Sequence, residues 1–139
     1  MTSDIGPTGE AAKLTFSGDA SRSLLVVDDD PPFRNRLARA MEKRGFDVVA
    51  VDSVAMGIEV AQESAPVFAV VDLRLGDGSG LDVVAALRDA RPDSRIVVLT
   101  GYGNIATAVA AVKAGAVDYL PKPADADAVE AALLADGRP

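Results

Sequence analysis

The stretch Leu24-Leu25-Val26-Val27-Asp28-Asp29-Asp30 decides the fold, because an unbroken apolar run of strand length ends abruptly in carboxylates. A short continuous apolar run of this kind is typical of a strand that is buried on both faces, as in a parallel sheet. Two later runs end in a charge as well: Val67-Phe68-Ala69-Val70-Val71 runs into Asp72, and Val117-Asp118-Tyr119-Leu120-Pro121 runs into Lys122. The C-terminal ends of parallel strands converge at one edge of a sheet, so we expect these charged side chains to share one site.

Helical spacing separates these runs along the chain, because apolar residues recur at three and four positions between them. The pattern predicts strands at 24–27, 48–51, 67–72, 96–100 and 117–121, and helices at 31–44, 54–63, 81–89, 105–114 and 125–135. Asp30 and Ser53 are predicted N-caps, and Pro121, which has no backbone donor, places the last strand at a sheet edge. Five strands alternating with five helices predict an α/β fold, a doubly wound five-stranded parallel sheet with helices on both faces.

The composition restricts the classes of function. The chain has 139 residues, 49% of them hydrophobic, which suits one domain with a single core. It has no cysteine and no histidine, which excludes disulfides and thiolate metal sites and disfavours Zn²⁺. The net charge of −7, with 14 basic residues spread over many elements, argues against nucleic-acid binding by this chain alone. No apolar run approaches a membrane span and no leader pattern is present, so we expect a cytoplasmic protein without a membrane partner.

The chain divides into three parts by composition. Residues 1–22 mix Gly, Ser, Thr, Pro and Asp without periodicity and are expected to form a flexible N-terminal extension. The folded domain is expected over residues 23–135. Residues 136–139, Asp-Gly-Arg-Pro, are interpreted as the start of a linker.

Four of the five predicted strands end in polar groups that suit phosphate and metal chemistry. These groups are Asp28 with Asp29, Asp72, Thr100 and Lys122. Taken alone, Asp72 would be a turn or helix cap and Lys122 a surface lysine, but coincidence is the weaker explanation for the whole set. Crowded carboxylates raise one another's pKa unless a cation neutralises them, and the simplest cation for carboxylate and carbonyl oxygens is Mg²⁺.

These groups predict a site for phosphoryl transfer. The predicted metal-binding residues are Asp28, which orients the metal or holds a bound water, Asp29, Asp72 and Arg74, which offers its loop carbonyl. Asp72 is expected to attack a phosphoryl group in line, while Mg²⁺ and the Lys122 ammonium neutralise charge. The Thr100 hydroxyl is expected to donate to a phosphate oxygen once Asp72 is phosphorylated.

The ordered motifs resemble a known family. They are Leu24-Leu25-Val26-Val27-Asp28-Asp29, Val70-Val71-Asp72, Val98-Leu99-Thr100-Gly101 and Asp118-Tyr119-Leu120-Pro121-Lys122-Pro123. Together they resemble the receiver domain of two-component response regulators, which has a flavodoxin-like fold, over residues 23–135. The stretch 100–109, with Lys113-Ala114-Gly115-Ala116, is most similar to the PrrA, RegA and ActR group of redox-responsive transcriptional activators.

The resemblance implies a phosphorylation switch. It implies that Asp72 accepts a phosphoryl group from a phosphohistidine on a sensor histidine kinase and that Lys122 pairs with Asp72 or its phosphate. It also implies that Thr100 and Tyr119 form the switch pair, although Tyr119 is also compatible with an edge aromatic that packs without switching. The chain would then be a phosphoacceptor that supports its own phosphotransfer and autodephosphorylation, and not a conventional enzyme. We hypothesise that Arg74 slows this hydrolysis.

The resemblance also implies partners. Phosphorylation would promote a homodimer through the fourth helix, fifth strand and fifth helix. Transcription would then be controlled by a DNA-binding output domain that follows the linker at 136–139. The basic residues of the helix at 31–44 either form a solvated face or, with Pro32 and Phe33, dock on the kinase.

Three other functions are compatible with parts of the sequence. A phosphohydrolase of the haloacid-dehalogenase type also uses an Asp nucleophile with Mg²⁺, but it would place the nucleophile at Asp28 and require a Thr that the stretch 28–32 lacks. A receiver-like binding module that works without phosphorylation is disfavoured by the presence of the full set of acceptor and metal residues. Dinucleotide binding is the weakest alternative, because acids and prolines follow the first strand where a Gly-rich phosphate loop is needed.

Overall fold

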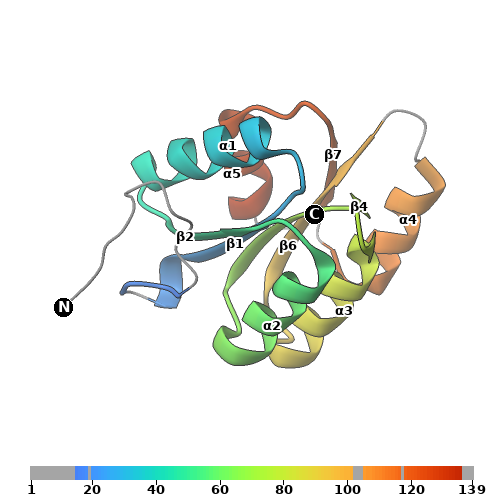
Figure 1. The fold of residues 1–139 in the computed structure, drawn as a ribbon, viewed down its shortest axis with the longest axis horizontal. Coiled ribbons are helices and arrows are strands. Elements are labelled where there is room, and N and C mark those ends of the chain that lie inside the picture. Colours follow the sequence, from blue (N-terminus) through green and yellow to red (C-terminus); the bar gives the residue numbers. More distant parts are fainter. Residues whose placement is uncertain (1–14, 19, 102–104, 117, 136–139) are drawn as a thin grey trace.

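A five-stranded parallel sheet forms the centre of the domain (Figure 1). The computed structural model describes residues 15–18, 20–101, 105–116 and 118–135. The strands are β1 (Ser23–Val27), β2 (Asp47–Val51), β3 (Phe68–Asp72), β6 (Arg95–Thr100) and β7 (Asp118–Pro121), and their order in the sheet is β2-β1-β3-β6-β7. The central strands β1 and β3 are buried along their whole length, which explains why their sequences are unbroken apolar runs.

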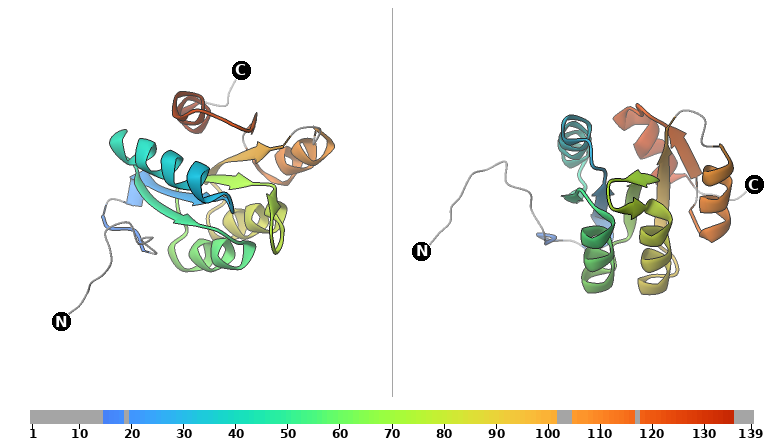
Figure 2. Two further views of the ribbon diagram at one scale, coloured as in Figure 1. Left: turned by 45° about the horizontal axis from the view of Figure 1, so that its top comes forward. Right: turned by 45° about the vertical axis from the view of Figure 1, so that its right-hand side comes forward.

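Within the described residues, five α-helices cover the two faces of the sheet. α1 (Pro31–Lys43) and α5 (Ala126–Leu134) lie on one face, and α2 (Val54–Ser64), α3 (Gly80–Ala90) and α4 (Ile105–Ala114) lie on the other (Figures 1 and 2). This arrangement confirms the predicted α/β fold with a doubly wound parallel sheet. None of these helices combines the length and apolar character required to cross a membrane.

The alternation of side chains along the strands divides the core into two layers. Leu25 and Val27 of β1 pack in the layer that includes α2 and α3, whereas Leu24 and Val26 pack in the layer that includes α1 and α5. The parallel register pairs Val27 with Val71, so β1 and β3 end at nearly the same level. The residues that follow these two strands therefore meet at one edge of the sheet.

The predicted elements agree with the observed ones to within one residue at their described ends. Asp30 and Ser53 are N-caps, as predicted, and β7, which contains Pro121, lies at the edge of the sheet. The stretch 73–80 differs from the expected loop, because it contains an antiparallel pair, β4 (Arg74–Leu75) with β5 (Gly78–Ser79). Strands of two residues are too short to leave a periodic pattern in the sequence.

The segment before β1 contacts the domain at its described residues. The Asp47 carboxylate at the start of β2 accepts hydrogen bonds from the backbone N–H groups of Ser17 and Gly18, at 2.7 and 2.9 Å. Phe16 packs against the core layer that includes α2 and α3. Residues 1–14 of the predicted flexible extension, and the linker at 136–139, lie outside the described residues, so the domain boundaries stay a prediction.

Three arginines bind backbone carbonyls at the C-terminal ends of helices α1, α2 and α5. The pairs are Arg22 with Arg44 and Gly45, Arg91 with Ala65, and Arg95 with Leu133 and Ala135. Carbonyls at helix ends lack intrahelical partners and form the negative pole of the helix dipole, so each guanidinium stabilises the end that it contacts. Because the helices run antiparallel to the strands, these contacts lie at the opposite edge of the sheet from Asp28 and Asp72.

Arg95 provides a test of these contacts. Replacing Arg95 with Met keeps an apolar stem but leaves the last carbonyls of α5 without their donor. We expect Arg95→Met to lower the free energy of unfolding by about 1 to 2 kcal/mol, measured by urea denaturation. Arg39→Met, on the exposed face of α1, is the matched control and should change this free energy by less than about 0.5 kcal/mol. An equal loss in the two variants would contradict a capping role for Arg95.

Candidate functional site

Three aspartates gather at the C-terminal edge of the sheet. Asp28 and Asp29 follow β1, Asp72 ends β3, and one carboxylate oxygen from each lies within 4.8 Å of the others. Asp28 and Asp72 are buried, whereas Asp29 is exposed. The pairing of β1 with β3 thus brings together residues that are more than forty positions apart in the chain.

Lys122 forms ion pairs with two of these carboxylates. Its Nζ lies 3.0 Å from Asp28 Oδ2 and 3.2 Å from Asp72 Oδ2. The backbone N–H of Lys122 donates to the Thr100 carbonyl at 2.9 Å, which continues the pairing of β6 with β7 beyond the last strand residue. The main chain therefore fixes the point from which the lysine side chain reaches the acid cluster.

Burial dominates the electrostatics of Asp28. Removal from water raises the pKa of the Asp28 carboxyl above its ordinary value, and the negative charge of Asp72 adds to this rise. The hydrogen bond from the Asp30 N–H, at 2.9 Å, and the contact with Lys122 oppose it. For Lys122, burial acts to lower the pKa, but the contacts with Asp28 and Asp72 outweigh burial and raise it. The ammonium therefore stays charged at neutral pH, yet it is a single positive charge among three carboxylates.

The donor set fits a hard divalent cation. Asp28 Oδ2 is buried and accepts no hydrogen bond of good geometry from the described residues, although Lys122 Nζ lies 3.0 Å away. The Lys122 ammonium is thus the cation beside this oxygen, and it is shared with Asp72 Oδ2 at 3.2 Å. Three carboxylates that converge within 4.8 Å are ligands of the kind that Mg²⁺ and Ca²⁺ prefer. The residues present are therefore suited to such a cation.

The backbone after β3 shapes the loop beside Asp72. The Arg74 N–H donates to Asp72 Oδ1 at 3.1 Å, and the Gly80 N–H donates to the Leu73 carbonyl at 3.0 Å. A Cβ atom on Gly80 would lie 2.2 Å from the Asp72 carbonyl oxygen. This close approach requires glycine at position 80, and it places the start of α3 against the end of β3.

Asp77 anchors the same loop to α2. Its carboxylate, in the turn between β4 and β5, accepts hydrogen bonds from the backbone N–H groups of Val54, at 2.8 Å, and Ala55, at 3.1 Å. These two bonds lower the pKa of the Asp77 carboxyl. The sequence pattern shows a Gly-rich stretch here but does not predict this contact.

Thr100 and Tyr119 lie on the neighbouring strands β6 and β7. Thr100 is buried at the end of β6, and its Oγ1 donates to the Leu120 carbonyl at 3.5 Å. Tyr119 is partly exposed on the edge strand β7, with Val98 as its register partner. The two residues are therefore close in the fold, while their role as a switch pair stays a prediction.

Two residues of α1 contact the site in a way that the sequence pattern did not predict. Arg34, expected on the outer basic face of α1, donates from Nη1 to the Asp28 carbonyl at 2.9 Å. The ring of Phe33, expected next to the active site as part of a surface that docks on the kinase, has its centroid 4.9 Å from Lys122 Nζ. The side chains of a helix point toward its N-terminus, and the N-terminus of α1 lies at the site. This rule is the feature of the sequence from which the two contacts could have been predicted.

Comparison of the sequence with known protein families agrees with this geometry. Residues 24–134 match the family described as the response regulator receiver domain. The chain belongs to this family. It is thus a receiver domain of the response-regulator family, whose curated members here are regulators, and a role in transcription regulation fits it.

Two curated regulators illustrate the similarity of this receiver domain. The photosynthetic apparatus regulatory protein RegA of Cereibacter sphaeroides is 66% identical over 127 residues, which are 91% of this chain and 69% of that protein. The acid tolerance regulatory protein ActR of Sinorhizobium medicae is 61% identical over 128 residues, which are 88% of this chain and 66% of that protein. The predicted similarity to the RegA and ActR group is confirmed, and the chain spans about two thirds of the length of these relatives.

A solved structure shares the fold. A response regulator from Burkholderia pseudomallei, described with a phosphorylated aspartic acid, a calcium ion and citrate, is 45% identical to this receiver domain with a TM-score of 0.78. The match covers 84% of this chain and 68% of that chain. The doubly wound sheet of this receiver domain is therefore also found in a related regulator.

The raised pKa of Asp28 makes a prediction about stability. Since the folded receiver domain binds a proton on Asp28 more tightly than the unfolded chain does, the resulting stabilisation is full at low pH and is lost as pH rises through the raised pKa. At neutral pH without divalent cations, Asp28→Asn should therefore be more stable than the wild type, by on the order of 1 kcal/mol. The difference in the free energy of unfolding between Asp28→Asn and the wild type should increase as pH rises from about 4, the ordinary pKa of Asp. At higher pH this difference should become constant.

Urea denaturation across this pH range is the measurement. Asp29→Asn, which removes an exposed carboxylate, is the matched control and should change metal-free stability by less. Added Mg²⁺ should stabilise the wild type by mass action and stabilise Asp28→Asn much less. A metal-free Asp28→Asn that is less stable than the wild type would show that the contact with Lys122 outweighs the cost of burying Asp28.

Proposed function

We propose that Asp72 is the phosphoacceptor of this receiver domain and that its phosphoryl donor is the phosphohistidine of a sensor histidine kinase. The observation that carries the proposal is the ion pair of Asp72 Oδ2 with Lys122 Nζ, at 3.2 Å, beside Asp28 and Asp29. The other oxygen of Asp72 accepts the Arg74 N–H. The carboxylate is thus held in one orientation next to a cation, which favours in-line attack on phosphorus.

In the proposed transfer step, a carboxylate oxygen of Asp72 attacks the phosphorus of the phosphohistidine. A P–O bond forms and the P–N bond breaks, and its electron pair stays on the imidazole nitrogen, which takes up a proton from solvent. The Lys122 ammonium balances charge on the phosphoryl oxygens, and the Thr100 hydroxyl donates to one of them. The transfer needs positioning and charge neutralisation more than covalent chemistry from the protein.

We propose Mg²⁺ as the cofactor of this step. Asp28, Asp29 and Asp72 would hold it, with the Arg74 carbonyl as a further ligand. When bound, Mg²⁺ neutralises charge on the phosphoryl oxygens during transfer. The Burkholderia pseudomallei regulator, which is described with both a phosphorylated aspartic acid and a calcium ion, supports this proposal.

In this proposal, hydrolysis returns the phosphorylated domain to its unphosphorylated form. Water attacks the phosphorus of the acyl phosphate, the bond between phosphorus and the Asp72 oxygen breaks, and inorganic phosphate and a free carboxylate result. Arg74, whose side chain is exposed two residues after Asp72, is proposed to slow this attack. The domain would then act on its own phosphorylation and turn over no other substrate.

We propose that phosphorylation acts through dimerisation. The charge and the acceptor oxygens of the phosphoryl group favour a conformation in which the Thr100 side chain moves toward the phosphoryl group. The Tyr119 side chain would then rotate into the space that Thr100 leaves. Large exposed apolar side chains lie on the elements next to this pair: Val109 and Val112 on α4, Tyr119 on β7 and Leu134 on α5. A cytoplasmic homodimer would then bring DNA-binding domains outside this chain onto paired half-sites. The relatives, which are longer than the matched stretch, support this part of the proposal.

The first test is the intact mass of the protein after incubation with acetyl phosphate, with and without Mg²⁺. We expect a Mg²⁺-dependent gain of one phosphoryl group that hydroxylamine removes, because an acyl phosphate is labile to this nucleophile. Asp72→Asn should abolish the gain. Asp89→Asn, which removes an exposed carboxylate on α3, is the matched control and should keep it.

The alternatives give different results in this test. No gain in the wild type would favour the binding module that works without phosphorylation. A gain that persists in Asp72→Asn but is lost in Asp28→Asn would move the nucleophile to the first strand and favour a phosphohydrolase.

The proposed dimer is tested by light scattering coupled to size exclusion, with and without acetyl phosphate and Mg²⁺. We expect the phosphorylated wild type to double in mass, and Val112→Glu to weaken this dimer at least about tenfold, because a charge enters an apolar contact. Asn35→Glu, which adds the same charge to the exposed face of α1, should leave the dimer intact. Equal dimerisation of Val112→Glu and the wild type would exclude the α4 surface.

A further inference from the structure

We propose that Phe33 is a positioning residue for Lys122, an inference that rests on the proposed role of Lys122 in phosphoryl transfer. The Lys122 Nζ lies 4.9 Å from the centroid of the Phe33 ring. An ammonium within about 6 Å of an aromatic ring centroid is attracted by the negative face of the ring, and the attraction grows when the cation is partly withdrawn from water. The Lys122 side chain is 21% exposed and Phe33 is 5% exposed, so this contact is largely shielded from solvent.

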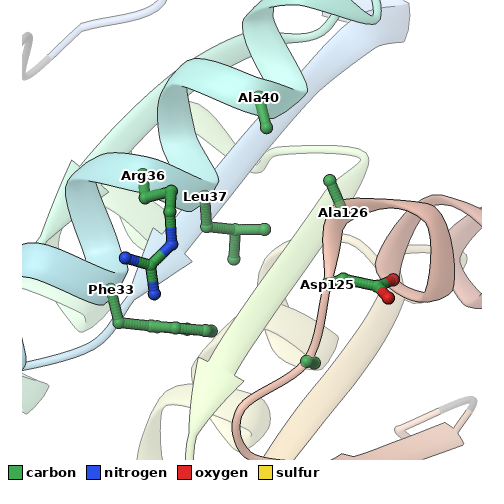
Figure 3. A pocket seen from close by; sticks show the side chains of 7 residues that line it. Phe33, Arg36, Leu37, Ala40, Asp125 and Ala126 are labelled. Atoms are coloured by element: carbon green, nitrogen blue, oxygen red, sulfur yellow. The ribbon is translucent and has the colours of Figure 1, made fainter.

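The α1 helix fixes the ring in this place. Phe33 lies in the first turn of α1, where the Asp30 cap accepts its backbone N–H, and its side chain packs in the core layer with Leu37 and Met41. Phe33 also forms one wall of a pocket of about 140 Å³ between α1 and the start of α5, and Figure 3 shows its ring beside Leu37 there. The ring is therefore held by the helix and the core, independently of the lysine.

The ring gives the ammonium a contact that uses no carboxylate oxygen. The ion pairs of the Lys122 ammonium in the described residues are with Asp28 and Asp72, the residues that the phosphoryl group and the cation would also engage. Lysine has a flexible four-carbon stem whose many rotamers must be restricted before it can act. A ring that attracts the ammonium restricts them and keeps the charge beside Asp72 when the carboxylates are engaged by other partners.

Phosphorylation kinetics with acetyl phosphate provide the first test. Phe33→Leu keeps an apolar side chain but removes the ring, and we expect it to lower the rate of Asp72 phosphorylation roughly three- to tenfold. Phe33→Met serves the same purpose if Phe33→Leu does not fold. Phe33→Tyr keeps the ring and should retain a rate within about twofold of the wild type. Leu37→Ala, in the same pocket wall, is the matched control, which should lose stability but keep the rate.

A double-mutant cycle separates positioning of Lys122 from general packing. In a Lys122→Met background the ring has no ammonium to position, so Phe33→Leu should produce no further loss of rate. If Phe33→Leu slows phosphorylation as much in this background as in the wild type, Phe33 acts through packing and the proposal is overturned. An unchanged rate for Phe33→Leu in the otherwise wild-type protein would overturn it as well.

A spectroscopic measurement tests the contact without any phosphorylation. A nearby aromatic ring shifts the proton resonances of the Lys122 side chain in NMR spectra, and this shift should be lost in Phe33→Leu and kept in Phe33→Tyr and Leu37→Ala. A Lys122 signal that Phe33→Leu leaves unchanged would refute the contact. A wild type that shows the ring shift but gains no phosphoryl group would instead count against the proposed function and leave Phe33 as a structural partner of Lys122 only, so the two failures are distinguishable.

Discussion

The pairing of the buried Asp28 carboxylate with the Lys122 ammonium is the interaction on which the rest of the site depends. A carboxylate withdrawn from water is destabilising unless it is paired, and Lys122 offers one positive charge to Asp28 and Asp72 together. The exposed Asp29 adds a third negative charge within the same 4.8 Å cluster. The folded domain therefore carries an excess of negative charge at one edge of its sheet. That excess explains why this edge suits a divalent cation, which would offset the negative charge that otherwise repels a phosphoryl group.

At the opposite edge of the sheet, positively charged arginine side chains contact backbone carbonyls. There the ends of α1, α2 and α5 present backbone carbonyls, and Arg22, Arg91 and Arg95 donate to them. Both edges follow from the same topology, because parallel strands place all their C-terminal ends on one side and the C-terminal ends of the helices on the other. The contacts that stabilise the domain are thus separated from the charges that its chemistry requires. Changes of charge at Asp72 are separated by the length of the sheet from the arginines that hold the helix ends.

The sequence predicts the elements and the chemistry of strand ends better than it predicts contacts between side chains. Asp28 and Asp72 are predictable because apolar runs mark the buried strands β1 and β3, whose C-terminal ends meet in a parallel sheet. Lys122 follows the exposed edge strand β7, and the same parallel topology brings it to this edge. The β4–β5 pair was missed because two-residue strands have no period. The contact of Phe33 with Lys122 joins residues 89 positions apart, and it depends on the direction of one side chain on α1, which hydrophobic spacing does not encode.

The position of Lys122 on the sheet explains how one lysine can serve a site that other cations also enter. A divalent cation and the ammonium would contact the same carboxylates, so binding of the cation would weaken the attraction of these carboxylates for the ammonium. The Lys122 backbone is hydrogen-bonded to the Thr100 carbonyl, and its ammonium also lies against the Phe33 ring. Neither contact involves a carboxylate, and so neither is lost when Asp28 changes partner. The lysine could therefore lose its contact with Asp28 and still remain beside Asp72, where negative charge would develop in the proposed phosphoryl transfer.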